Sequence, residues 1–261
     1  MITNNEDKIM KPFLLMGAGK VHLDILDPET FEPNGLQMKG NCTKLNIKPD
    51  SEIIEEFGAS DEDLFQTIGS VAVPKPASGS AEFNQFDQEL FAAIFMGTNS
   101  LLEQEKGEVK DRVITVKHDR MFELGKYKIS DFVAKDENAS KTYEPEKDYM
   151  IRPRVGGFVP NSSGAIPADS KVKLSYKWPV IEGTVMSGMT RSNVVARILW
   201  EGRNMDDGRE FILDIFRARL ASSGDFNFQN AIEKKFIRAG FNFSMETPPG
   251  KMAPFKLLWL N

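Results

Sequence analysis

The sequence predicts a mainly β protein with one flanking α-helix. Three observations lead to this fold class: period-two alternation of apolar and polar residues, Gly- and Pro-containing turns between the alternating segments, and a single segment with helical periodicity. Hydrophobic residues make up 41% and charged residues 27% of the chain, which is sufficient for a globular core. We expect one domain over residues 1–261 with a sandwich or barrel-like sheet.

Four segments show the alternation of half-buried strands: residues 21–25, 44–48, 171–178 and 241–245. In the clearest of them, Val172, Leu174 and Tyr176 alternate with lysine and serine. Each of these segments is expected to bury one face and to expose the other.

Two longer apolar runs, 193–200 and 209–220, flank the turn sequence Asp206-Asp207-Gly208 and predict a long hairpin. In the second run, apolar residues occupy both alternation phases. A strand that is apolar on both faces is normally covered on both sides. We therefore expect a neighbouring subunit to cover one face of this hairpin.

Residues 85–96 predict the helix. Phe86, Leu90 and Ile94 are spaced so that they share one face, Asn84 is a suitable N-cap, and Gly97 is a suitable stop. This apolar face predicts packing against a sheet.

Four segments predict arms and loops. Residues 1–12 predict an N-terminal arm, and the acidic segment 49–67 predicts a short helix, a mobile loop or a protruding hairpin. The polar and Gly/Pro/Ser-rich stretches 134–148 and 156–170 predict a loop-rich insertion over about 120–170.

Charge is divided unequally along the chain. The net charge is −5, but residues 1–105 hold 18 acids, seven lysines and no arginine, so every arginine follows residue 105. This division is consistent with self-association between oppositely charged faces, and equally with two surfaces that pair within one monomer.

Motifs for catalysis or for cofactor binding are absent from the sequence. Gly17-Ala18-Gly19-Lys20 lacks the spacing of a phosphate-binding loop, and we expect a hairpin turn there. His22 and His118 are far apart in the sequence and have no ligand-spaced partners, Cys42 is the single cysteine, and residues 203–208 predict a tight turn rather than a cation loop. We expect no enzyme activity, catalytic residue, cofactor or metal.

The apolar segments are too short for membrane helices, and residues 1–13 lack the pattern of a signal peptide. These features, with the single cysteine, predict folding in a reducing cytoplasm. With a negative net charge and no recognisable nucleic-acid module, specific DNA binding is not expected.

The stretch GSVAVPKPASGSAEFNQFDQELFAAIFMGT (69–98) resembles the tail tube proteins, the major tail proteins of long-tailed bacteriophages. The order of elements is similar: a strand, a Pro-containing turn, a second strand and a helix that ends in Gly. Residues 165–178 and 201–229 resemble later parts of that family, so that the resemblance extends over roughly 10–260.

The resemblance implies a structural virion protein whose subunits form hexameric rings, which stack into a hollow tube for genome delivery. The implied partners are further copies of the chain and the tape-measure, tail-tip and tail-terminator proteins, with DNA passing through the lumen without specific binding. The implied location is the virion tail, after assembly in the host cytoplasm. Two alternatives remain open: a monomeric β-sandwich module that binds carbohydrate or protein, and a tube protein of the type VI secretion kind.

The division of charge suggests candidate inter-subunit contacts between acidic and arginine side chains. The acidic candidates are Asp50, Glu52, Glu55, Glu56, Asp61, Glu62 and Asp63, and the basic candidates are Arg191, Arg197, Arg203, Arg209, Arg217 and Arg219.

Overall fold

The computed structural model describes residues 12–260. The predicted N-terminal arm over residues 1–12 therefore lies, except for its last residue, outside the described residues. The chain folds into two compact units, and Ser100–Val185 forms the second unit inside the sequence of the first. One domain with an insertion over 120–170 was expected. The second unit begins earlier in the chain than that insertion and ends later.

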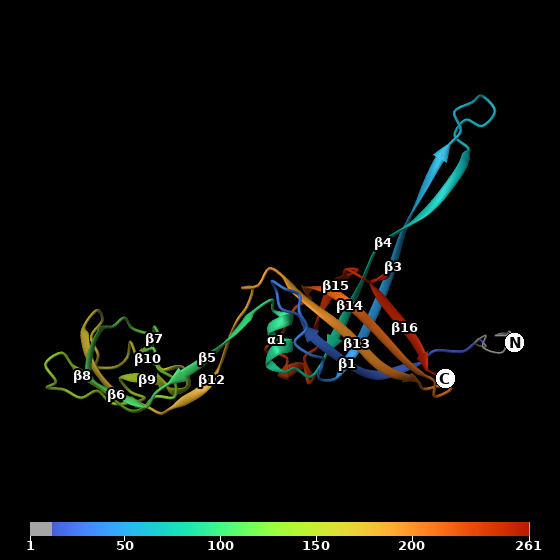
Figure 1. Ribbon diagram of the computed structural model, residues 1–261. Helices are drawn as coiled ribbons and strands as arrows, with labels where there is room; N and C mark the ends of the chain where they lie inside the picture. The colour runs from blue at the N-terminus through green and yellow to red at the C-terminus, as the bar shows by residue number, and fades with distance from the viewer. Residues whose placement is uncertain (1–11, 261) are drawn as a thin grey trace. The chain divides into compact units, whose positions relative to one another are not determined.

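The first unit is built on one eight-stranded sheet with the order β2-β1-β13-β14-β15-β4-β3, in which β16 also pairs with β14 (Figure 1). All its strand pairs are antiparallel. The strands are β1 (Gly17–Ile25), β2 (Gln37–Met38), β3 (Cys42–Phe57), β4 (Thr67–Phe83), β13 (Val194–Asn204), β14 (Glu210–Ser223), β15 (Ala239–Met245) and β16 (Phe255–Leu260).

The mainly β fold is confirmed, but the sheet is not a closed barrel. Within residues 12–260, β2 pairs only with β1 and β3 pairs only with β4, so the two ends of the strand order do not join. The two-residue β2 offers too short an edge to close the sheet. The sheet therefore keeps open edges, which are available for pairing with another chain.

The predicted long hairpin is β13–β14, at the centre of the sheet. Both strands pair on both sides, and Ile198 and Ile215 are fully buried. The opposite phase of β14 is only partly buried at Ile212 and Phe216. The turn also forms as expected: Gly208 has a φ of 77°, and the side chain of Asn204 accepts from the backbone of Met16 and donates to Asp207.

The helix α1 (Gln88–Ile94) is shorter than the predicted 85–96, and its N-cap is Asp87 rather than Asn84. The Asp87 carboxylate accepts from the backbone N–H of Leu90 at 2.7 Å and also pairs with the buried Lys39. Asn84 instead accepts from the side chain of Asn41. The buried face of the helix, Leu90, Ala93 and Ile94, belongs to the same core as the sheet, as the apolar spacing predicted.

Gly17-Ala18-Gly19 does not form the expected hairpin turn, because it is the beginning of β1 and pairs with residues 202–204 of β13. A Cβ on Gly19 would lie 2.3 Å from the carbonyl oxygen of Glu201. The glycine is therefore required by the close approach of two strands rather than by a turn.

The second unit has its own core and contains two three-stranded sheets, β7-β10-β9 and β6-β11-β8. The two-stranded ribbon β5–β12 includes the residues at which the chain passes between the two units. The strands are β5 (Thr98–Gln104), β6 (Gly107–Thr115), β7 (Phe122–Glu123), β8 (Ser130–Asp136), β9 (Tyr149–Arg152), β10 (Gly157–Pro160), β11 (Lys171–Trp178) and β12 (Ile181–Ser187).

The stretches 134–148 and 156–170 are not simple loops. Tyr143, Phe158 and Ile166 are buried in the core of the second unit, and β10 lies within the second stretch. These buried residues could not be recognised from the sequence, because single buried side chains between turns give no periodic pattern.

Candidate assembly interface

The acidic segment forms part of a long hairpin that continues past the sheet. Residues 78–83 of β4 pair with β15 on one side and with β3 on the other, whereas residues 67–75 pair with β3 alone. We call residues 50–75 the arm (Figure 1). Pro49, Pro74 and Pro76 lie where the arm leaves the sheet, as expected for strands that lack a ladder on both sides.

The arm is exposed along its whole length. Gly58 is its one buried residue, and only Asp63 is partly buried. Eight large apolar side chains on the arm are solvent-exposed: Ile53, Ile54, Phe57, Leu64, Phe65, Ile68, Val71 and Val73. A two-stranded hairpin is barely stable alone in water, and this amount of exposed apolar surface on one indicates an interaction surface.

Acidic and apolar side chains share the same face of the arm. The register places Glu52 opposite Val73, Ile54 opposite Val71, and Glu56 opposite Gly69. Side chains directly opposite each other on an antiparallel pair lie on the same face. A partner for this face therefore needs both apolar contacts and positive charge.

Most arm acids have no cationic partner. Glu52 pairs with Lys75 at 3.1 Å, and this is the arm's one ion pair within residues 12–260. Asp63 accepts from the side chain and the backbone of Ser60, and these bonds lower the pKa of its carboxyl. Asp50 accepts from the backbone of Ser51. In the described chain, the side chains of Glu55, Glu56, Asp61 and Glu62 make no hydrogen bond or ion pair.

Four of the six predicted arginines contact residues of the first unit that lie outside the arm. Arg197 of β13 donates two hydrogen bonds to the buried Asp214, both at 2.9 Å, and this carboxylate raises the pKa of Arg197. Arg219 pairs with Glu246, and Arg209 pairs with Asp207. Arg217 lies over the ring of Phe31.

These four arginines are therefore already used inside their own unit, which the charge pattern of the sequence could not reveal. The side chains of Arg191 and Arg203 make no ion pair in the described part of the chain. Arg203 is exposed on β13 and Arg191 is half-buried before it.

A further basic and apolar surface was not predicted from the sequence. The loop between β14 and β15 exposes Phe228, Ile232 and Phe236, the last two at 92% and 90%, together with Lys234 and Lys235. We call residues 225–238 the basic loop. The run Lys234-Lys235-Phe236-Ile237-Arg238 was the available signal, but short runs of this kind are also common on solvated surfaces.

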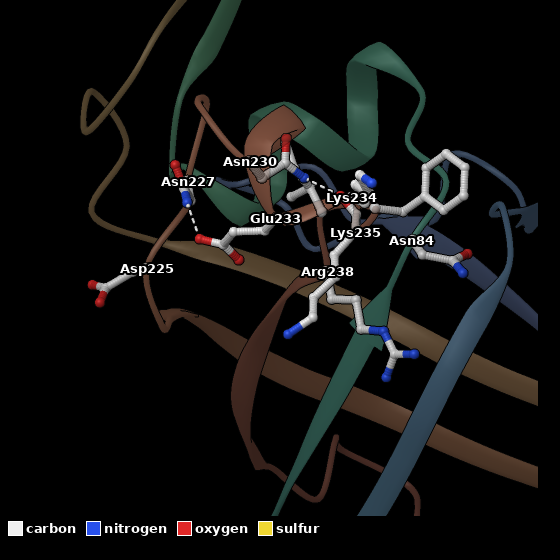
Figure 2. A pocket seen from close by; sticks show the side chains of 10 residues that line it. Asn84, Asp225, Asn227, Asn230, Glu233, Lys234, Lys235 and Arg238 are labelled. Atoms are coloured by element: carbon white, nitrogen blue, oxygen red, sulfur yellow. Dashed lines mark hydrogen bonds between the residues drawn. The ribbon is translucent and has the colours of Figure 1, made fainter.

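The basic loop lines a cavity of about 570 Å³ together with Asn84 (Figure 2). In Figure 2, Lys235 and Arg238 lie between Glu233 on one side and Asn84 on the other. Glu233 accepts from Asn227 at 3.3 Å, and Asn230 donates to the backbone carbonyl of Lys235. The lining is mostly polar and charged, with two lysines, one arginine, two acids and three asparagines beside Phe236 and Ile237.

The two histidines are engaged in separate contacts. His22 pairs with Glu201 at 3.0 Å in the first unit, and His118 contacts the carbonyl oxygen of Ile166 in the second. Among residues 12–260, no group of three or more His, Cys, Asp or Glu is placed to hold a metal ion. No helix in the same range is long and apolar enough to span a membrane.

The comparisons with known proteins give one family. No curated protein matches the chain. A family model described as "Protein of unknown function UCP028589" matches residues 14–237, which include the arm, the whole second unit and most of the basic loop. This match covers well over half of the sequence, and the chain therefore belongs to that family.

Proposed function

We propose that this chain is a structural virion protein, the tail tube protein of a long-tailed bacteriophage. In this proposal its copies assemble into hexameric rings, and the rings stack into the hollow tube through which the genome is delivered. The observation that carries the proposal is the arm, because its eight exposed apolar side chains are not covered by any part of residues 12–260. An assembling subunit supplies that cover from its neighbours.

The open sheet supports the same proposal. The edges of β2, β3 and β16 each have one paired side within the described residues. A sheet that is completed by neighbouring copies loses such exposed edges, which otherwise promote uncontrolled aggregation. The partly buried Ile212 and Phe216 on the second face of β14 are a further surface that a neighbour would cover.

Net charge suits a conduit for DNA. A ring of six copies at −5 each would carry about −30, which repels phosphates rather than retaining them. The role is structural rather than catalytic, with tape-measure, tail-tip and terminator proteins as further partners. The place of action is the virion tail, after assembly in the host cytoplasm.

Negative-stain electron microscopy, combined with sedimentation velocity over a concentration series, tests the proposal. The expected result is rings or tubes with a central channel and a sedimentation coefficient that rises with concentration. A protein that stays monomeric at high concentration, even when preformed tail tips are supplied, would contradict the proposal and favour a monomeric binding module.

A further inference from the structure

We propose that the basic loop of one copy is the docking surface for the arm of the next copy, so that the copies associate head to tail. This inference rests on the proposed self-assembly and names the two surfaces that meet. The basic loop takes the place of the predicted arginines as the cationic partner of the arm acids, because four of those six arginines are already engaged within their own unit.

The first argument is geometric. Strand β4 joins the two surfaces, because its first residue, Thr67, adjoins the tip of the arm and its last residue, Phe83, pairs with Ala239 directly after the basic loop. Seventeen strand residues extend over about 55 Å. The arm tip and the basic loop therefore lie at opposite ends of the first unit.

Two complementary surfaces at opposite ends of one molecule make a heterologous contact, which repeats from copy to copy. Direct contact between two arms is disfavoured, because their acids would repel one another, whereas contact between an arm and a basic loop brings opposite charges together.

The second argument is chemical. The arm presents Glu55, Glu56, Asp61 and Glu62 without a cationic partner in the described chain, beside exposed side chains such as Phe65 at 82%. The basic loop presents exposed cations beside exposed Ile232 and Phe236. Each surface thus offers what the other lacks: one supplies carboxylates, the other supplies ammonium and guanidinium groups, and both supply apolar area.

The cations of the basic loop are available for such a contact. Lys234 and Lys235 make no ion pair in the described chain, and the guanidinium of Arg238 is 3.8 Å from the Glu82 carboxylate, at the limit of an ion pair. Figure 2 places Lys235 and Arg238 together, away from Asp225 at the other edge of the cavity. The Glu233 carboxylate is held by Asn227 and does not pair with either lysine.

A charge-swap experiment tests the inference. The arm variant carries Glu55→Lys, Glu56→Lys, Asp61→Lys and Glu62→Lys, and leaves Asp63 to hold Ser60. The loop variant carries Lys234→Glu, Lys235→Glu and Arg238→Glu. Sedimentation velocity at low salt should show self-association weakened about tenfold or more in each variant alone, because several exposed pairs become repulsive together.

An equimolar mixture of the two variants is the decisive sample. When the two variants alternate, the wild-type arm of the loop variant meets the wild-type loop of the arm variant. The lysine-bearing arm of the arm variant meets the glutamate-bearing loop of the loop variant. Both contacts join opposite charges, so association should recover. The matched control carries Lys106→Glu, Lys117→Glu and Arg120→Glu, which are exposed residues of the second unit. This control changes the net charge as the loop variant does and should assemble like the wild type.

The outcomes separate this inference from the proposed function. Tubes that form equally well from the loop variant, or a mixture that stays as weak as its components, would overturn the docking of arm on loop and leave the tube proposal in place. Recovery in the mixture without rings or tubes would support the docking and contradict the tube. A wild-type protein that never self-associates would contradict both.

Discussion

Two long hairpins of the first unit differ in what covers them. β13–β14 is at the centre of the sheet, paired on both sides, with Ile198 and Ile215 fully buried. β3–β4 is at the edge of the sheet. In its arm, residues 50–75, the two strands pair only with each other. Both hairpins are rich in apolar residues, but β13–β14 buries many of them in the core, whereas β3–β4 buries only those near its sheet end, such as Phe83, and exposes those of the arm. Apolar content thus predicts that a surface is covered, but it does not say by which chain.

The largest difference between the two hairpins is expected in monomer stability. Ile215→Ala removes a fully buried side chain and should lower the free energy of unfolding by about 3 kcal/mol. Ile54→Ala on the arm should change it by less than about 0.5 kcal/mol. Urea unfolding of both variants below the association concentration measures the contrast. Equal losses would mean that the arm is packed within the monomer, and the comparison would fail.

A smaller difference is expected between the ion pairs inside the sheet and those on its surface. Asp214→Asn weakens two charged hydrogen bonds from Arg197 at a buried position and should cost about 2 kcal/mol. Glu246→Gln weakens the partly exposed pair with Arg219 and should cost less than about 1 kcal/mol. Thermal unfolding of both variants compares the two costs. A greater loss in Glu246→Gln would contradict the view that the buried Asp214 carboxylate makes the stronger of the two pairs.

The smallest expected effect is a change in the protease sensitivity of the arm between the monomer and the assembled state. In the monomer, a protease should cut first near the arm tip, residues 58–66, because this turn is exposed and lies outside the sheet. After assembly this site should be protected. Residues 134–170 serve as the internal control, since their buried tyrosine and phenylalanine anchors predict resistance in both states. Equal cleavage of the arm before and after assembly would mean that it does not enter the interface.

Much of the first unit could be predicted from local sequence. Two apolar runs on either side of a turn sequence predict the β13–β14 hairpin, alternation predicts the later part of β1, and the spacing of Leu90 and Ile94 predicts the helix. The position of the cap is ambiguous because Asn84 and Asp87 are both good N-caps, and the contact of Asp87 with Lys39 is not visible in a sequence. The second unit resembles a loop-rich insertion in sequence, since its core includes single anchors between turns.

The candidate interface was predictable only in part. The acidic run locates the arm, but the apolar residues of the arm are scattered among acids and give no continuous signal. The arginines are distinguished in the sequence only by their position, whereas Arg197, Arg209 and Arg219 turn out to be paired with carboxylates of their own unit. Partners that are distant in sequence, such as Asp214 for Arg197, can be identified only from the folded chain.

Removal of the arm shows whether it serves contacts between copies or the fold of one copy. Replacing residues 50–75 by Asn-Gly shortens the hairpin to a turn and leaves the pairing of β4 with β15 intact. We expect the truncated chain to unfold within a few degrees of the wild-type Tm and to form no rings or tubes in electron micrographs, because the arm contributes contacts between copies rather than within one. A truncated chain that assembles as well as the wild type, or one that no longer folds, would contradict this role of the arm.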